Sequence, residues 1–181
     1  MTSLQAHQQI CRKFSALLSY PDTEVQATAA ACQQLLQQNR PEVAPQLQSF
    51  ITALAVTDQA RIEEIFTATF DLQPLCHPFV GYQLCGESQQ RTMILMKLQE
   101  IYRQHDYSSG TELPDHLSEV LRFIASTNDQ VCRDELINDG LLPALEKIIA
   151  AIENDDHPYK GLLKTLQSFL TESSADKGAL S

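Results

Sequence analysis

Apolar residues recur along this chain at intervals of three and four positions, which is the period of an amphipathic helix. One stripe runs through Ile10, Phe14 and Leu17, and another through Ile62, Phe66 and Phe70. Similar stripes follow within residues 94–102, 117–124, 141–152 and 162–170. No segment shows the convincing alternation of a half-buried strand, so the pattern predicts helix after helix.

Turn-forming residues separate these stripes and set the expected helix limits. They are Tyr20-Pro21-Asp22, Asn39-Arg40-Pro41, Thr57-Asp58, Gly110, Asn138-Asp139-Gly140 and His157-Pro158. Short polar turns favour antiparallel neighbours, so we predict an all-α, single-domain antiparallel bundle of about seven or eight helices. The helical domain should span residues 1–170, and the small polar tail 171–181 is expected to be disordered.

One connection departs from the short-turn pattern. Residues 71–87 form an irregular stretch of about 17 residues, longer than most structureless loops in compact domains. The stretch contains Cys76, His77 and Cys85. Its length predicts a functional or mobile loop.

The charge of the chain restricts its partners. The 181 residues carry a net charge of −10 with dispersed basic residues, which argues against nucleic-acid binding and favours a cationic peptide or protein segment. No apolar run reaches the length of a membrane span, and the N-terminal residues lack a secretory pattern, so we expect a cytoplasmic protein without stable membrane insertion. Five scattered cysteines make a poor disulfide framework and predict mostly buried thiols.

Two groups of residues could carry chemistry. Cys76, His77 and Cys85 are potential zinc ligands or a redox-sensitive thiol pair, but their spacing is unlike that of structural zinc sites. Asp115 and His116 could suggest a hydrolytic dyad, yet adjacent side chains on a helix point about 100° apart. The chain has no nucleophile elbow, zinc-protease motif or phosphate loop, and we therefore predict that it is not an enzyme.

The segment around Asp115 also has a structural explanation. Pro114 suits the first position of a helix, and Asp115 would then meet the positive end of the helix dipole. His116 remains unexplained by this argument, because its positive form would be disfavoured there. His116 is therefore a candidate functional residue.

Four segments of the chain match a known family. The most specific is Glu112-Leu113-Pro114-Asp115-His116-Leu117, followed by Val120-Leu121-Arg122-Phe123. Looser matches are Phe66-Thr67-Ala68-Thr69-Phe70-Asp71-Leu72, Gly86-Glu87 with Arg91, and Tyr102. Together they resemble the NarJ/TorD/DmsD-type molybdoenzyme assembly chaperones, nearest the NarJ branch, in which the first segment is the hallmark. The resemblance covers residues 10–170.

The resemblance implies a cytoplasmic, all-helical, non-enzymatic chaperone with no cofactor of its own. Its partner would be the catalytic subunit of a molybdopterin oxidoreductase. The chaperone would bind the N-terminal or twin-arginine signal region of that subunit and assist cofactor insertion and assembly before the enzyme is exported. A monomer and a domain-swapped dimer both remain open. The implied client-binding residues are Phe66, Phe70, Asp71, Tyr82, Glu87, Arg91, Tyr102, Glu112, Pro114, Asp115 and His116.

Within that set, four aromatic residues, Phe66, Phe70, Tyr82 and Tyr102, would line an apolar groove, although the helical stripe favours the core for Phe66 and Phe70. The chain departs from what is usual in nitrate reductase chaperones at Thr92 and in the segment 76–85. That segment is more similar to the corresponding segment of chaperones that serve selenate, chlorate, dimethylsulfide or ethylbenzene oxidoreductases. These departures leave the client enzyme open. Two alternatives also remain: a helical scaffold or regulatory module, and a thiol or zinc sensor.

Overall fold

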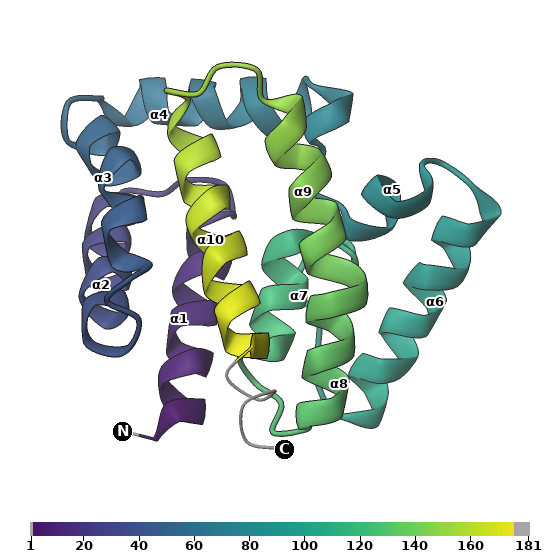
Figure 1. Ribbon diagram of the computed structural model, residues 1–181. Helices are drawn as coiled ribbons and strands as arrows, with labels where there is room; N and C mark the ends of the chain where they lie inside the picture. Colours follow the sequence, from purple (N-terminus) through teal and green to yellow (C-terminus); the bar gives the residue numbers. More distant parts are fainter. Residues whose placement is uncertain (1, 176–181) are drawn as a thin grey trace.

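The computed structural model describes residues 2–175, and this part of the chain folds into one helical bundle without strands (Figure 1). Its α-helices are α1 (Ser3–Leu17), α2 (Val25–Asn39), α3 (Gln48–Ala55), α4 (Gln59–Phe66), α5 (Val80–Cys85), α6 (Gln89–Gln104), α7 (Leu117–Ile124), α8 (Gln130–Glu135), α9 (Leu142–Ala151) and α10 (Pro158–Ala175). Two short 3-10 helices, η1 (Ala44–Leu47) and η3 (Pro74–Cys76), and two π-helices, η2 (Thr67–Asp71) and η4 (Leu136–Leu141), complete the set. The predicted all-α class is confirmed.

Polar side chains begin several of the helices. Thr2 accepts a hydrogen bond from the backbone of Gln5 in a reciprocal capping box. Asp58, Ser88 and Asp129 each accept one from the backbone amide three residues later. Such caps satisfy amide groups that have no partner within the helix, and they fix where α1, α4, α6 and α8 start.

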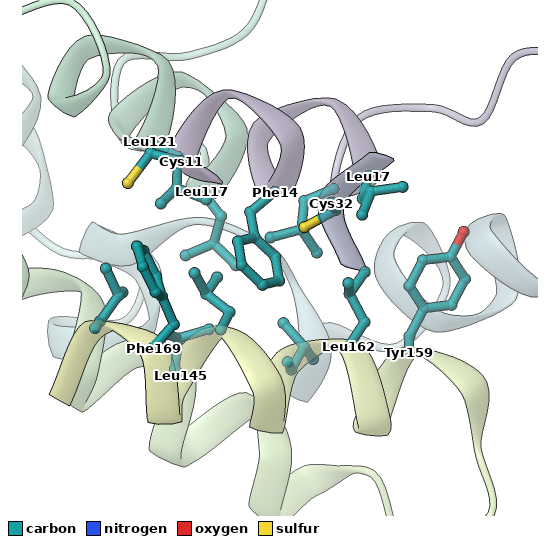
Figure 2. Packing of buried hydrophobic residues seen from close by; sticks show 14 of the residues in the cluster. Cys11, Phe14, Leu17, Cys32, Leu117, Leu121, Leu145, Tyr159, Leu162 and Phe169 are labelled. Carbon is teal, nitrogen blue, oxygen red and sulfur yellow. The ribbon is translucent and has the colours of Figure 1, made fainter. Parts of the chain in front are cut away.

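The apolar stripes meet in one large core at the centre of the bundle. Phe14 of α1 stacks against Phe169 of α10 with ring centroids 6.0 Å apart, and Leu145 of α9 packs into the same cluster (Figure 2). Leu117 and Leu121 bring α7 into contact with it. These residues are fully buried, so the stripes predicted from the sequence are the faces that form the core.

The turn predicted at residues 138–140 does not form. Helix α8 continues through η4 into α9, and the three elements follow one another without a break. Ile137 and Leu141 on either side of the predicted turn are buried, because the apolar stripe of α9 extends back across it. One wider π turn accommodates the polar residues while the helix continues.

The irregular loop predicted at residues 71–87 is largely folded. It contains the end of η2, the whole of η3 and the whole of α5. The side chain of Gln83 donates hydrogen bonds to the carbonyl oxygens of Leu75 (3.1 Å) and His77 (2.9 Å). Lys147 of α9 donates to the carbonyl oxygen of Gln83 at 2.6 Å. These bonds reach across turns and between elements, which is why periodicity alone could not find this structure.

Helix α10 runs to Ala175, beyond Leu170, where the sequence analysis ended the helical domain. Ser173 is buried and donates its hydroxyl to the carbonyl oxygen of Phe169 at 2.7 Å. The prediction of a disordered tail is therefore wrong for the first residues after Leu170, and residues 176–181 lie outside the described residues. None of the described helices has the length and apolarity needed to cross a membrane.

Tyr159 provides a test of the core, because its buried hydroxyl has no hydrogen-bond partner among the described residues. We expect Tyr159→Phe to raise the free energy of unfolding by about 1 kcal/mol, since it removes a desolvated polar group and keeps the ring. The matched control is Tyr102→Phe, which removes a hydroxyl that does donate a hydrogen bond, at 2.8 Å to Pro114. That variant should lose about 1 kcal/mol. Urea denaturation measures both, and a loss in Tyr159→Phe would contradict the assignment.

Candidate functional site

The segment before α7 is not helical. Pro114 and Asp115 form a turn in which the amide of His116 donates to the carbonyl oxygen of Leu113 at 3.0 Å, and His116 itself is extended. The amide of Val80 donates to the carbonyl oxygen of Asp115, and the amide of Leu117 donates to that of Pro78, both at 2.7 Å. Phe79 and His116 thereby form an isolated antiparallel bridge. The expectation that Pro114 and Asp115 occupy the first helical positions is wrong, because pairing with residues 78–80 holds them outside the helix.

Asp115 forms a buried ion pair with Arg91. Its carboxylate is fully buried, and Arg91 Nε donates to its Oδ2 at 3.1 Å. Arg91 also binds the exposed carboxylate of Glu87. The guanidinium of Arg91 lies over the rings of Phe79 and Tyr82, 5.2 Å and 5.7 Å from their centroids, in a cation–π arrangement. These contacts compensate in part for the desolvation of two charges, while Asp115 Oδ1 is buried with no hydrogen-bond partner among the described residues.

Tyr102 forms a second link between α6 and the same segment. Its hydroxyl donates to the carbonyl oxygen of Pro114 at 2.8 Å. Arg91 and Tyr102 lie about three turns apart on one face of α6. The start of the helix is therefore fixed to Asp115, and its end is fixed to the neighbouring Pro114. We call Glu87, Arg91, Tyr102, Pro114 and Asp115 the Asp115 network.

His116 is the N-cap of α7 and is neutral. Its Nδ1 accepts a hydrogen bond from the amide of Ser118 at 3.1 Å, which places the ring proton on Nε2. Burial lowers the pKa of His116 to about 4. The carboxylate of Asp115 faces Arg91 while the ring of His116 faces Ser118, so the two side chains form no dyad.

Phe66, Phe70, Asp71 and Glu112 are not part of this network. Phe66, Phe70 and Tyr102 are 5%, 1% and 3% exposed, so the apolar groove predicted from them and Tyr82 does not exist. Phe66 and Phe70 instead pack against Tyr159 in the core, as their helical stripe favoured. Asp71 and Glu112 are exposed.

The possible zinc or thiol site is not assembled. Among the described residues no group of three histidine, cysteine, aspartate or glutamate side chains could hold a metal ion. Cys76 is buried, which raises the pKa of its thiol and keeps it protonated. His77 packs against the ring of Tyr82, and Cys85 donates its thiol to the carbonyl oxygen of Gly81 at 3.1 Å. Three separate environments hold the three side chains.

A groove with a volume of about 170 Å³ lies beside the Asp115 network. We call it the α6 groove, and α6 forms its outer wall at the edge of the molecule (Figure 1). Its lining is mainly apolar, with three charged residues: Val80, Leu84, Ile94, Lys97, Leu98, Ile101, Val120, Cys132, Glu135, Leu136, Asp139 and Gly140. Sequence reasoning missed it because the lining comes from five elements distant in the chain.

Sequence reasoning also missed a second buried carboxylate next to the network. Glu119 of α7 is fully buried and accepts hydrogen bonds from the Tyr107 hydroxyl at 2.6 Å and the Gly110 amide at 3.3 Å. Arg122 forms an ion pair with it across one helical turn. This cluster ties the connection between α6 and α7 to α7. The spacing of Glu119 and Arg122 was the available signal.

Two sequence comparisons show one family, and a comparison of structures shows the fold. The model of the family described as "Nitrate reductase delta subunit" matches residues 33–176. A Bacillus subtilis (strain 168) protein described as a nitrate reductase molybdenum cofactor assembly chaperone, NarJ, is 30% identical over 159 residues, covering 86% of this chain and 85% of that protein. A crystal structure of a redox enzyme maturation protein from Archaeoglobus fulgidus has a TM-score of 0.62 at 18% identity, covering 91% and 93% of the two chains, and shares the fold.

Gly81 provides a test of the packing around Asp115. A Cβ atom there would lie 2.9 Å from Asp115 Oδ2 and 3.2 Å from Arg91 Cγ, so Gly81→Ala must displace the buried ion pair. We expect the free energy of unfolding to fall by about 2 kcal/mol. The control is Gly140→Ala, whose Cβ meets only Val80 at an ordinary 3.5 Å and should leave stability unchanged or higher by up to about 1 kcal/mol. Equal effects in urea denaturation would refute the close approach.

His116 predicts a specific dependence of stability on pH. Because its pKa is lowered from 6.5 to about 4 in the folded state, the unfolded chain gains a proton first as the pH falls. The free energy of unfolding should therefore decrease between pH 6.5 and 4, by up to about 1.4 kcal/mol per pH unit from this residue.

His116→Asn removes the titration and keeps an N-cap acceptor. As the pH falls from 6.5 to 4, the free energy of unfolding of the original protein should therefore decrease relative to that of the variant. Groups present in both proteins, including His157, cancel in the difference. A difference that stays constant with pH would contradict a neutral, buried His116.

Proposed function

The chain belongs to the nitrate reductase delta subunit family, and we propose that it is an assembly chaperone for the catalytic subunit of a molybdenum-dependent nitrate reductase, not an enzyme. The observation that carries this proposal is the similarity to the Bacillus subtilis chaperone over 86% of the chain. In the proposed role, the protein binds the apo catalytic subunit in the cytoplasm. It holds that subunit until the molybdenum cofactor is inserted and assembly can proceed.

We further propose that the α6 groove binds the N-terminal segment of this client. The groove offers apolar side chains from α5, α6 and α7, and the exposed carboxylates of Glu135 and Asp139 lie at its edge. This combination suits a basic, partly apolar helix, which would place anchor side chains at helical spacing into an apolar groove. The net charge of −10 also favours encounter with a basic segment.

The size of the α6 groove limits how the client segment can bind. Its volume of about 170 Å³ is below the range of about 300–1,000 Å³ that is usual for ligand pockets. It therefore holds apolar side chains of the client rather than a complete helix. A client helix would lie along the mouth, with α6 moving outward to admit its anchors.

In this proposal the Asp115 network positions the groove wall. Arg91 and Tyr102 set the position of α6, and Pro114 and Asp115 supply the two points to which they bind. His116 starts α7, which contributes Val120 to the groove. Buried members of the network thus act on client binding through the position of α6.

Four of the predicted residues can touch the client directly. Tyr82 is half-buried, and Asp71, Glu87 and Glu112 are exposed, although none of the four lines the α6 groove. Phe66 and Phe70 contribute to the core instead. The proposed contact surface is therefore smaller than the set of residues that the family resemblance implied.

The α6 groove can be tested with two neighbouring residues on one helix. Ile94 lines the groove, whereas Met93 is 69% exposed and does not. We expect Ile94→Gln to weaken binding of a synthetic peptide carrying the N-terminal segment of the client about tenfold, because an amide would enter an apolar contact. Met93→Gln should change the affinity by less than about twofold, since it stays in solvent.

Isothermal titration calorimetry gives the affinities, and circular dichroism melting curves report whether each variant remains folded. Equal losses in the two variants would place the binding site elsewhere. Absence of any peptide binding by the original protein would contradict the proposal that the α6 groove binds the N-terminal segment of the client.

A further inference from the structure

A second and larger groove lies away from α6, which contributes none of its lining residues. Its volume is about 680 Å³, and it lies between α4 with η2 and η3 on one side and the connection from α9 to α10 on the other, at the top of Figure 1. We call it the η2 groove. Its lining residues are Arg61, Glu64, Ile65, Ala68, Thr69, Gln73, Leu75, Cys76, Ala151, Ile152, Glu153, Asn154, Asp156, His157 and Pro158, and none of them lines the α6 groove.

The two walls of the η2 groove are joined by a hydrogen bond. His157 Nδ1 accepts from the amide of Tyr159 at 3.2 Å, so the ring proton is on Nε2. This Nε2 lies 3.1 Å from Thr69 Oγ1 and donates to it, while the Thr69 hydroxyl donates to the carbonyl oxygen of Ile65 at 2.6 Å. Burial lowers the pKa of His157, which keeps the ring neutral. The groove is therefore preformed, as binding sites usually are.

The floor of the η2 groove is apolar and partly open to solvent. Ile65, Ala68 and Ile152 contribute to it, and Leu75 at its edge is 72% exposed. Leu72, in the same connection, is 69% exposed. Exposed apolar side chains next to a groove are typical of a surface that binds another protein.

The rim of the groove carries uncompensated negative charge. Arg61 pairs with Glu64 at 2.6 Å, and Lys160 pairs with Asp155 at 2.8 Å, so these nearby cations are already partnered. Glu153 and Asp156 are exposed and form no ion pair with any described residue. The groove therefore presents two carboxylates above an apolar floor.

This combination selects one kind of occupant. A phosphate-bearing ligand would meet carboxylates and no unpaired cation in the lining, and a wholly apolar segment would desolvate Glu153 and Asp156 without compensation. A peptide segment with basic and apolar side chains satisfies both requirements, since its cations pair with the rim.

We propose that the η2 groove docks a basic, partly apolar segment of the client polypeptide, distinct from the N-terminal segment at the α6 groove. This inference rests on the proposed function, because it takes the client to be the same catalytic subunit. Two separate contacts with one client make the second contact intramolecular, which raises the overall affinity beyond that of either site. The two grooves share no lining residue, so each can be changed alone.

The test compares two probes. One is the full-length apo catalytic subunit of the nitrate reductase from the same organism, and the other is the synthetic peptide of its N-terminal segment. Glu153→Lys and Asp156→Lys reverse the rim charge, and Glu146→Lys is the matched control because Glu146 is exposed on α9 and lines neither groove. Ala68→Phe fills the floor without changing charge. Melting curves should show that all four variants stay folded.

We expect each rim reversal to weaken binding of the full-length subunit about fivefold to tenfold at low ionic strength, with a smaller effect at high salt. Ala68→Phe should weaken it similarly at every salt concentration. Peptide affinity should be unchanged in all variants, and Glu146→Lys should affect neither probe.

Two results would overturn the inference: rim variants that match Glu146→Lys on the full-length subunit, or rim variants that lose peptide affinity to the same degree. The second result would mean that the N-terminal segment itself binds the η2 groove. If the original protein binds neither probe, the proposed function fails, which is distinguishable from failure of the second site alone.

Discussion

The buried ion pair between Asp115 and Arg91 is the interaction on which the arrangement of α5, α6 and the segment before α7 depends. A carboxylate with no exposure to solvent is strongly destabilising unless a cation and hydrogen bonds compensate it. Arg91, near the start of α6, supplies the cation. Its guanidinium lies over the rings of Phe79 and Tyr82, and these contacts fix the position of that end of α6. It also requires close approach of α5 at Gly81. Three helices thus take their relative positions from one buried charge.

The two halves of the bundle are held together by different forces. Around α1, α9 and α10 the large apolar core provides the cohesion, with aromatic rings and leucines in direct contact. Around α6 the apolar cluster is small, and polar bonds from Arg91 and Tyr102 to residues 114–115 set the position of the helix. A helix held by a few directional bonds can move when those bonds yield, whereas a close-packed core cannot. This contrast supports our proposal that the client segment binds beside α6.

Both grooves have a π-helical segment in their walls. Residues Ala68 and Thr69 of η2 line one groove, and Leu136, Asp139 and Gly140 of η4 line the other. A π turn inserts an extra residue into a helix and is frequent at functional sites, because it redirects side chains without ending the helix. In this chain η4 also carries the helix from α8 into α9 past polar residues that predicted a turn, whereas η2 ends the helix that begins with α4.

The sequence by itself determined that the protein is helical and which faces are buried, because a stripe such as Ile10, Phe14 and Leu17 depends only on the period of the helix and the removal of apolar surface from water. Its likeness to a known family also singled out Arg91, Tyr102 and Asp115, which do come together. Only the tertiary structure decided that residues 114–116 form a turn and a bridge ahead of α7, that 71–87 is folded, and where the grooves lie. Each of these depends on hydrogen bonds or walls contributed by residues far apart in the chain, and such pairings leave no periodic signal in the sequence.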